Sequence, residues 1–490
     1  MNINIYLKQK LKEKEVHVEN LIKQSGSSKS TVYRVMTGLQ KPSTKLRNEI
    51  IKILDLNHAE QQELLYYISI TDVDENLVEA REAVHHFLFA EKNNLPKPIE
   101  LVYYEKEKYV RSFEHILEGV IETSKEKNFS CEFKMVNCIQ NDIISPLAAA
   151  LEVLLANKAS CTLEHLINFS THDYKENINT LSNIIPLLTL DNYILKYRES
   201  ENVSDYGFFH DFMILNYSYK GKDGNVIKKT LYLSFLSSNL SSCYVVNEDD
   251  PNTSEFFNRN YDSIEEKYQS ALSSRNNLTE YLSTIRRMYT DYEVSIFRPH
   301  IGLSRVPMEV YNSILKRASV EEFVKFFFRD EYDKENLDAH IEELSSYAQS
   351  IIESTYINKQ IDVFTKSGLE KFASTGTVND HLNQLPAFNQ EEVKMILESI
   401  KARDLNPKDP LNFFIVKQDY VDPNLSLAAM DNGCLLIEKY VEGSTLYSVI
   451  EHKKLSHLFA DFAQHYVPAM MAIPQKEAHE FIDYLIEKYC

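Results

Sequence analysis

Tryptophan is absent from this sequence, and glycine and cysteine are scarce, with eleven and six residues. No glycine-rich loop is followed by Lys and Ser or Thr, which excludes a nucleotide site of the phosphate-loop type. The cysteines include no pair at two-residue spacing, which excludes a zinc ribbon and favours reduced thiols that fill cores. The six are Cys131, Cys138, Cys161, Cys243, Cys434 and Cys490. A redox pair of Cys131 and Cys138 would require adjacent sulfurs.

Long apolar runs are also missing. No stretch is long enough to span a bilayer, and the first residues lack the apolar block of a signal peptide. We therefore expect a cytoplasmic protein without a membrane partner. The hydrophobic share of 43% is typical of a folded chain, and 490 residues favour several domains rather than one core.

Catalytic and metal-binding patterns are missing as well. No HExxH occurs, and adjacent His85 and His86 would diverge by about 100° on a helix, which disfavours a shared metal. His300 lies near Arg298 and Arg305 and offers either an anion site at a strand end or a loop histidine with satisfied hydrogen bonds. The sequence therefore predicts no catalytic residue, no metal and no cofactor, and hence no enzyme.

In segment 16–54, the spacing of apolar, capping and turn residues predicts three short helices around a common core. Apolar residues from Val18 to Ile22 recur at helical spacing and stop at Gly26, which tolerates a left-handed turn. Ser28 is placed to cap a second helix, and Gly38 ends it. Polar and basic residues would follow one face of that helix, and Val32, Val35 and Met36 would face a core. A third helix would begin at Pro42 and Ser43 and complete this core with Leu46, Ile50, Ile53 and Leu54.

The order GSSKSTVYRVMTG, KPS and LRNEIIKIL resembles the lambda-repressor-like, or XRE, family of DNA-binding domains over the first seventh of the chain. The resemblance implies an all-α helix-turn-helix domain, 1–70, whose second helix enters the major groove of double-stranded DNA. It places Ser28, Lys29, Ser30, Thr31, Tyr33 and Arg34 on the recognition helix. We expect base readout from Lys29, Ser30, Thr31, Tyr33 and Arg34, and phosphate contacts from Ser28 and Lys41.

The charge distribution favours the same end of the chain. Up to Leu54, eleven basic and four acidic residues give 11 − 4 = +7, whereas the whole chain carries −19. The remainder therefore carries −26 and would repel a polyanion. Alternatively, the lysines of the first helix merely solvate its surface.

Behind this head we expect a large α/β body with a mixed sheet. A helical connector, 71–96, ends in the turn residues NNLPKP. The first α/β domain, 97–285, alternates strands and helices and indicates a mostly parallel sheet. Its predicted elements are strand 99–104, helix 109–127, strand 131–139, helix 145–158, strand 161–169 and helix 177–197, followed by a hairpin around Asp223 and Gly224 and a strand at 241–246.

A second α/β domain, 286–490, would serve in sensing or oligomerisation. It begins with a strand-like segment at 292–304, continues through helices to 358, and ends in four strand-like pieces and helices 453–469 and 475–489. No repeat of 20 to 50 residues is evident, which disfavours helical-repeat sensors. The two halves share no matched motif.

The two-part body and its tail CLLIEKYVEGSTLYSVIEHKKLSHLFADFAQHY resemble the catalytically inactive phospholipase-D-like domains of some regulators. The active enzymes need a His, a Lys two residues on and an Asp five beyond, so that an imidazole attacks phosphate. His452 and Lys454 begin such a string, but Phe459 stands at the Asp position and Asp461 comes two residues late. The resemblance therefore implies a body without this chemistry.

Together these features predict a transcriptional regulator that binds a near-palindromic operator as a homodimer. A small-molecule, peptide or protein effector would act on the body. Two alternatives stay open. In the first, the head is a protein-interaction module; Val18 and Ile22, which stand where the family often has Gln and Ala, support this alternative. In the second, the chain is a DNA-tethered enzyme whose body has an unrecognised activity.

Overall fold

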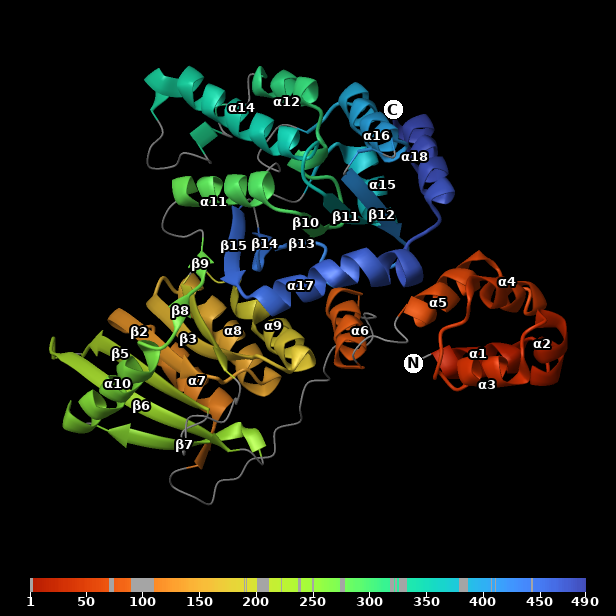
Figure 1. The fold of residues 1–490 in the computed structure, drawn as a ribbon. Helices are drawn as coiled ribbons and strands as arrows, with labels where there is room; N and C mark the ends of the chain where they lie inside the picture. Colours follow the sequence, from red (N-terminus) through yellow and green to blue (C-terminus); the bar gives the residue numbers. More distant parts are fainter. Residues whose placement is uncertain are drawn as a thin grey trace.

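The structure is a computed structural model, and it forms a helical head and a larger α/β body (Figure 1). It describes residues 3–69, 75–89, 110–188, 190, 192–200, 211–221, 223–236, 239–248, 251–273, 278–317, 321, 324–325, 333–378, 387–406, 408–409, 411–441 and 444–490. Among the helices of these residues, none is both long and apolar enough to cross a bilayer.

The head, residues 3–69, consists of five helices. They are α1 (Ile3–Glu13), α2 (Val18–Ser25), α3 (Lys29–Met36), α4 (Thr44–Ile53) and α5 (His58–Ser69). As predicted, α2 ends at Gly26 with φ +63°, and Ser28 Oγ caps α3 by accepting the Thr31 N–H at 3.1 Å. Ser43 caps α4 in the same way. The buried core comprises Ile3, Tyr6, Leu7, Leu21, Val32, Val35, Met36, Leu46, Ile50 and Leu54, with Ile53 at its edge.

The connector is helical, as predicted, in helix α6 (Glu75–Phe89). It packs against the body, where Leu88 O accepts the Val421 N–H at 3.0 Å and the Phe89 ring stacks on Tyr420 at 4.6 Å. The predicted boundary at 93–98 and strand at 99–104 lie outside the described residues.

The first half of the body is built on an eight-stranded sheet in the order β1-β7-β6-β5-β2-β3-β4-β8. The strands are β1 (Val110–Ser112), β2 (Lys127–Val136), β3 (Ser160–Ser170), β4 (Tyr193–Ser200), β5 (Phe212–Lys220), β6 (Val226–Leu236), β7 (Asn239–Glu248) and β8 (Gln269–Ser270). One face packs against α7 (Phe113–Thr123), α8 (Asn141–Ala156) and α9 (Tyr174–Leu188), and the other against α10 (Pro251–Glu265). Strands β2, β3 and β4 are parallel, and the β5–β6 hairpin turns at Gly224 with φ +85°, as predicted. The other neighbouring strands are antiparallel, so the sheet is mixed and the expectation of a mostly parallel sheet is wrong.

The predicted helix over 177–197 is wrong at its carboxyl end. Helix α9 stops at Leu188, and Tyr193 begins strand β4. Tyr193, Leu195 and Tyr197 are buried while their neighbours are more exposed, so this segment has the period of two that a half-buried strand requires. The predicted helix over 109–127 is likewise shorter, because residues 110–112 form β1 and α7 ends at Thr123.

The second half of the body has a seven-stranded sheet in the order β12-β11-β10-β13-β14-β15-β9. The strands are β9 (Leu272–Ser273), β10 (Val294–Phe297), β11 (Gln360–Thr365), β12 (Leu411–Val416), β13 (Leu425–Met430), β14 (Cys434–Val441) and β15 (Ser444–Glu451). Its helices are α11 (Leu278–Asp291), α12 (Met308–Leu315), α14 (Leu337–Ser354), α15 (Lys366–Thr375), α16 (Gln390–Asp404), α17 (Lys453–Asp461), the π-helix η7 (Phe462–Met471) and α18 (Gln475–Tyr489), with 3₁₀ turns η3 (Leu303–Arg305) and η5 (Lys334–Asn336).

The two halves repeat one topology, although the sequence shows no matched motif. In each, three parallel strands are followed by three antiparallel strands that extend the sheet from the first parallel strand, and a helix follows the last strand. The series β2, β3, β4, β5, β6, β7 and α10 thus corresponds to β10, β11, β12, β13, β14, β15 and α17. The predicted domain boundary at 285 falls inside α11, which packs against α14 of the second half. The chain passes from the first sheet to the second earlier, between β8 and β9.

One continuous helix, formed by α17 and η7, joins the parts of the molecule. Leu458, Phe459 and Phe462 belong to a core that contains residues of both sheets, so the two halves share one interior. Figure 1 shows this helix in blue between the halves, with the head beside its far end. Pro468 within η7 has no N–H for the α-type bond to the carbonyl four residues back, which favours the wider π turn.

Candidate nucleic-acid interface

Helix α3 presents a polar strip away from the head core. Lys29, Ser30, Tyr33 and Arg34 are exposed, and residues four apart on a helix lie on the same side. Lys29 and Tyr33 form one row, with Lys29 Nζ 5.8 Å from the Tyr33 ring centroid, and Ser30 and Arg34 form the next. The strip therefore offers two cations, a hydroxyl and an aromatic ring on one surface.

The two other predicted residues of α3 have their hydroxyls engaged within the head. Ser28 Oγ accepts the Thr31 N–H and lies 2.8 Å from Thr31 Oγ1. Ser28 is exposed and Thr31 is half-buried. Both therefore hold the amino end of α3 in place, a role that the capping position of Ser28 predicts.

Lys41 follows α3 in the connection to α4. It is half-buried and interacts with the rest of the chain, whereas Leu39 just before it is 74% exposed. The structure thus places four of the seven predicted DNA-binding residues on the strip, Ser28 and Thr31 at the amino end of α3, and Lys41 after α3.

The departures from the family pattern lie at the edge of the head core. Val18 and Ile22 are half-buried and pack against it. Ser27, the third departure, stands where the family often has an apolar residue, and its N–H donates to Ser25 Oγ at 3.3 Å. Ile22, the bulkier residue at a position where the family often has Ala, is therefore accommodated at the edge of the head core.

Part of the positive charge of the head is neutralised internally. Lys10 Nζ and Lys14 Nζ lie 3.0 and 3.2 Å from the two carboxylate oxygens of Glu60, a residue beyond the segment whose charge gave +7. Residues 1–69 contain eleven basic and seven acidic residues, so the head carries 11 − 7 = +4 and the remainder −19 − 4 = −23. The charge asymmetry persists, but α1 contributes less to it than the sequence suggests.

Glu60 also joins the start of α5 to α1. Its carboxylate accepts the Asn57 N–H while Asn57 Oδ1 accepts the Glu60 N–H, a reciprocal capping box, and its carbonyl accepts the Tyr6 hydroxyl. Burial alone would raise the pKa of Glu60, but the bonds from Asn57, Lys10 and Lys14 outweigh it and lower the pKa to about 2.

This lowered pKa predicts an acid-sensitive head. Stabilisation by the Glu60 carboxylate is complete above its ordinary pKa near 4.5 and is lost as the pH falls towards 2. Glu60→Gln should speed hydrogen exchange of α1 and α5 amides roughly five- to tenfold at pH 7, and the difference from the unsubstituted protein should shrink at pH 3. Exposed Glu19→Gln is the control. An effect of Glu60→Gln that does not change with pH would contradict this assignment.

The anion-site alternative for His300 does not fit the structure. Arg298 Nη2 and Arg305 Nε bind Asp362 at 2.9 and 2.6 Å, and all three side chains are buried. His300 Nδ1 lies 3.0 Å from Ile301 O in a buried loop. The two guanidinium groups thus serve an internal carboxylate, which a sequence position alone does not disclose.

The incomplete His–Lys string forms the junction of β15 and α17. His452 is fully buried, its Nδ1 accepts the Leu455 N–H at 3.1 Å, and its Nε2 lies 3.7 Å from Glu199 Oε1. Burial lowers the pKa of His452 and favours the neutral imidazole. Lys454 donates to Thr171 O, and Phe459 is a buried core residue. His452 therefore caps α17, and Lys454 anchors it to the first half of the body. Phe459 occupies the position at which the active enzymes need Asp.

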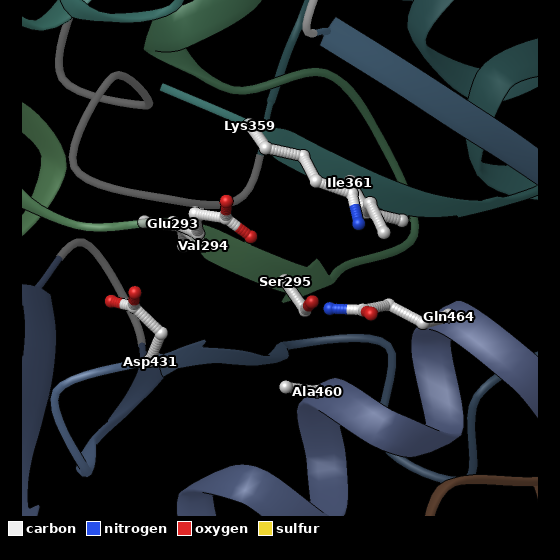
Figure 2. A pocket seen from close by; sticks show the side chains of 8 residues that line it. All are labelled: Glu293, Val294, Ser295, Lys359, Ile361, Asp431, Ala460 and Gln464. Atoms are coloured by element: carbon white, nitrogen blue, oxygen red, sulfur yellow. The ribbon is translucent and has the colours of Figure 1, made fainter.

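A small cavity lies between β10, β11 and the helix formed by α17 and η7. Figure 2 shows Glu293 and Asp431 on one side, Lys359 above, and Gln464 facing Ser295. Its volume is about 20 Å³. This is room for about one water molecule, so the cavity is too small for a substrate.

Comparison with known proteins assigns no family. No family model and no curated protein matches the chain. Among solved structures, it is similar to polyphosphate kinase from Porphyromonas gingivalis, with 9% sequence identity and a TM-score of 0.22. The similarity covers 80% of this chain and 59% of the kinase chain, so this chain spans little more than half of that protein. A likeness of this size assigns neither a fold family nor an activity.

Cys131 and Cys138 have separate partners in the structure and do not form the redox pair considered from the sequence. Cys138 Sγ donates to Val136 O and Phe212 O, while Cys131 faces Cys161 on the neighbouring strand. These cysteines and Cys434 are buried and free, as predicted. Within the described ranges, no group of three or more His, Cys, Asp or Glu side chains is placed to hold a metal.

The contacts between head and body were missed by the sequence reasoning. Tyr66 of α5 meets Tyr466 of η7 edge to face, with ring centroids 5.3 Å apart. Arg81 of α6 binds both carboxylate oxygens of Asp461 at 2.5 and 2.8 Å. These partners are about 400 residues apart, so no local spacing could indicate them.

Proposed function

We propose that this protein is a DNA-binding transcriptional regulator whose head is a lambda-repressor-like helix-turn-helix domain. The observation that carries the proposal is the strip of Lys29, Ser30, Tyr33 and Arg34 on α3, opposite its buried residues. Five consecutive helices with a tight turn at Gly26 support this interpretation. The proposal assigns no catalytic step to the body.

The dimensions of α3 suit the major groove. An α-helix with its side chains is about 10–12 Å in diameter, and the major groove of B-form DNA is about 12 Å wide, so α3 fits into it. Arg34 and Lys29 can donate to guanine O6 and N7, and Tyr33 offers an apolar surface to a thymine methyl group. Ser28 and Lys41 would lie nearer to the phosphates.

Charge dictates how the protein approaches DNA. The head carries +4 and the remainder −23, so only the head attracts phosphate. A homodimer would present two copies of α3 to two halves of a near-palindromic operator. The body would set their separation, and an effector that binds one body arrangement better would change DNA affinity.

A double substitution on α3 tests the proposal. Lys29→Ala with Arg34→Ala should weaken binding to the selected operator about 100-fold, because each base contact contributes about 1–3 kcal/mol. Both side chains are exposed, so the unfolding temperature should not change. The operator is first isolated by selection from random duplexes with the full-length protein, and affinity is then measured by fluorescence anisotropy.

The matched control is Lys125→Ala with Lys476→Ala, which removes the same charge from exposed positions of the body. This variant should bind the operator within about twofold of the unsubstituted protein, because its lost charges lie away from α3. Equal losses in both variants would mean that net charge, rather than α3, determines binding. Sedimentation of the complex should give two chains per duplex.

The protein-interaction alternative is favoured by one observation, the exposed apolar surface of Tyr33 and Leu39, 45% and 74% exposed. Salt distinguishes the two functions. Binding through DNA phosphates weakens steeply as salt rises, with a slope of about −0.9 per phosphate contact, whereas an apolar protein contact does not.

A further inference from the structure

A pocket of about 360 Å³ lies at the junction of the head and the second half of the body. Gln62 of α5 forms its wall on the head side, and β12, η7, α18 and the carboxyl end of α16 form the rest. The lining residues are Gln62, Asp404, Asn412, Phe413, Phe414, Ile415, Pro468, Ala472, Ile473, Pro474, Gln475 and Ala478. Small-molecule sites usually have volumes of roughly 300–1,000 Å³, so this pocket is of ligand size.

The pocket forms where the edge of the second sheet is only partly covered. Strand β12 is the last strand at that edge. The Ile473 N–H donates to Ile415 O at 2.9 Å, and Ala472 bridges to Val416, so the segment after η7 covers one end of β12. The pocket lies beside this segment, between prolines 468 and 474.

Eight of the twelve lining residues are apolar and form one wall, whereas Gln62, Asp404, Asn412 and Gln475 give the pocket a comparable polar surface. Phe413, Ile415, Ile473 and Ala478 are buried, and Pro468 is half-buried. An aromatic or aliphatic group on this wall would be removed from water at a gain of about 25 cal/mol per Å².

The charged group of the lining is Asp404, whose side chain is only 7% exposed. Its Oδ2 accepts from Gln475 Nε2 at 2.9 Å and from His479 Nε2 at 2.7 Å. Its Oδ1 accepts no hydrogen bond from the described residues. Adjacent Arg403 is held by two 2.8 Å bonds to Asp409, so it does not neutralise Asp404.

We propose that this pocket binds a small organic cation, an amine with an apolar body. The ammonium group donates to Asp404 Oδ1, and the apolar body packs on Phe413, Ile415 and Pro468. A carboxylate of the same shape is rejected, because it would place a like charge beside the partly desolvated Asp404. Gln62 completes the site from the head, so the bound cation contacts both head and body.

The consequence for DNA rests on the proposed function. A ligand that contacts Gln62 and β12 together binds the docked arrangement of head and body better than any arrangement in which α5 has moved away. By linkage, its binding favours that arrangement and changes operator affinity.

Calorimetry on the full-length protein tests the site, with phenethylamine as the probe and 3-phenylpropionate as its anionic counterpart. Phenethylamine should bind, and 3-phenylpropionate should bind at least tenfold more weakly. Asp404→Asn should reduce phenethylamine affinity at least tenfold. Equal binding of the two probes, or no binding of phenethylamine at millimolar concentration, overturns the proposal.

A second variant separates loss of the site from loss of folding. Gln62→Arg places a cation on the half-exposed head side of the pocket and should also reduce phenethylamine affinity at least tenfold. Gln9→Arg, the same change at an exposed residue outside the lining, should leave it unchanged. Full affinity in Gln62→Arg overturns the assignment of a head residue to the site. Operator affinity is measured in parallel, so a protein that binds phenethylamine but no DNA refutes the proposed function and not the pocket.

Discussion

Asp362→Asn is expected to lower the free energy of unfolding by about 3–5 kcal/mol, because it leaves two buried guanidinium groups without their carboxylate. Asp362 lies on β11, in the interior of the second sheet, and is fully buried. Arg298 donates to its Oδ1 at 2.9 and 3.2 Å, and Arg305 and Gln360 donate to its Oδ2 at 2.6 and 2.7 Å. Asparagine keeps the shape but removes the charge and one acceptor.

The protonation of Asp362 gives this prediction a pH signature. Burial alone would raise the pKa of its carboxyl, but Arg305 and Arg298 outweigh burial and hold the pKa below its ordinary value. The stabilisation is therefore complete above the ordinary pKa of about 3.9 and is lost as the pH falls below it. The stability of the unsubstituted protein should fall in acid more steeply than that of Asp362→Asn.

Urea unfolding followed by circular dichroism at pH 7 and at about pH 2.5, below the ordinary pKa of a carboxyl group, measures both effects. Asp483→Asn is the matched control, because Asp483 makes an ion pair with Lys401 at a side chain that is 56% exposed. Exposed pairs contribute little, so the control should change the free energy of unfolding by less than about 1 kcal/mol. If Asp362→Asn has no larger effect than Asp483→Asn, the buried cluster does not stabilise the fold as argued.

The elements that the sequence predicted correctly are those set by local chemistry. Ser28 and Ser43 cap α3 and α4 because a hydroxyl at that position reaches the N–H three residues on. Gly224 lies in the turn of the β5–β6 hairpin because glycine tolerates the positive φ that this turn requires.

The features that escaped prediction depend on partners far away in the sequence. Arg298 and Arg305 look like an anion site until Asp362, about sixty residues later, occupies them. The net charge of the head is +4 and not +7 because Asp55, Glu60 and Glu63 lie beyond Leu54. Glu60 also pairs with two lysines of α1. The repeated topology of the two halves is a property of strand order, which short sequence patterns do not encode.

The second large effect concerns the attachment of the head. Arg81 of α6 is buried, with a side chain 4% exposed, and it lies 5.8 Å from the Tyr66 ring centroid while binding Asp461. Burial lowers the pKa of Arg81, but its interactions with Asp461 and Tyr66 together outweigh burial and raise the pKa, so the guanidinium stays charged. Asp461 is therefore the carboxylate that permits a cation at this junction.

Asp461→Asn is expected to destabilise the docked arrangement of α5 and α6 by about 2–3 kcal/mol, because Arg81 loses its counter-ion while remaining buried. The cost is below that for Asp362 because Asp461 is 22% exposed and water can partly replace it. Hydrogen exchange of α5 and α6 amides should become about 30- to 150-fold faster, whereas exchange of α8 amides in the first half should not change. Unchanged exchange in α6 would show that the ion pair does not hold the connector.

Removing both charges should restore much of the stability that the docked arrangement of α5 and α6 loses in Asp461→Asn. Arg81→Met with Asp461→Leu leaves no unpaired charge and keeps side chains of similar volume, so its exchange should be slower than that of Asp461→Asn alone. This recovery would separate electrostatic anchoring from packing by Tyr66 and Tyr466, which both variants retain. Helix α6 links the head to the helix shared by both halves of the body. If the double variant forms a stable apolar contact in place of the ion pair, α3 should therefore keep its position relative to the body. If the double variant is instead as labile as Asp461→Asn, shape rather than charge determines how the head is held.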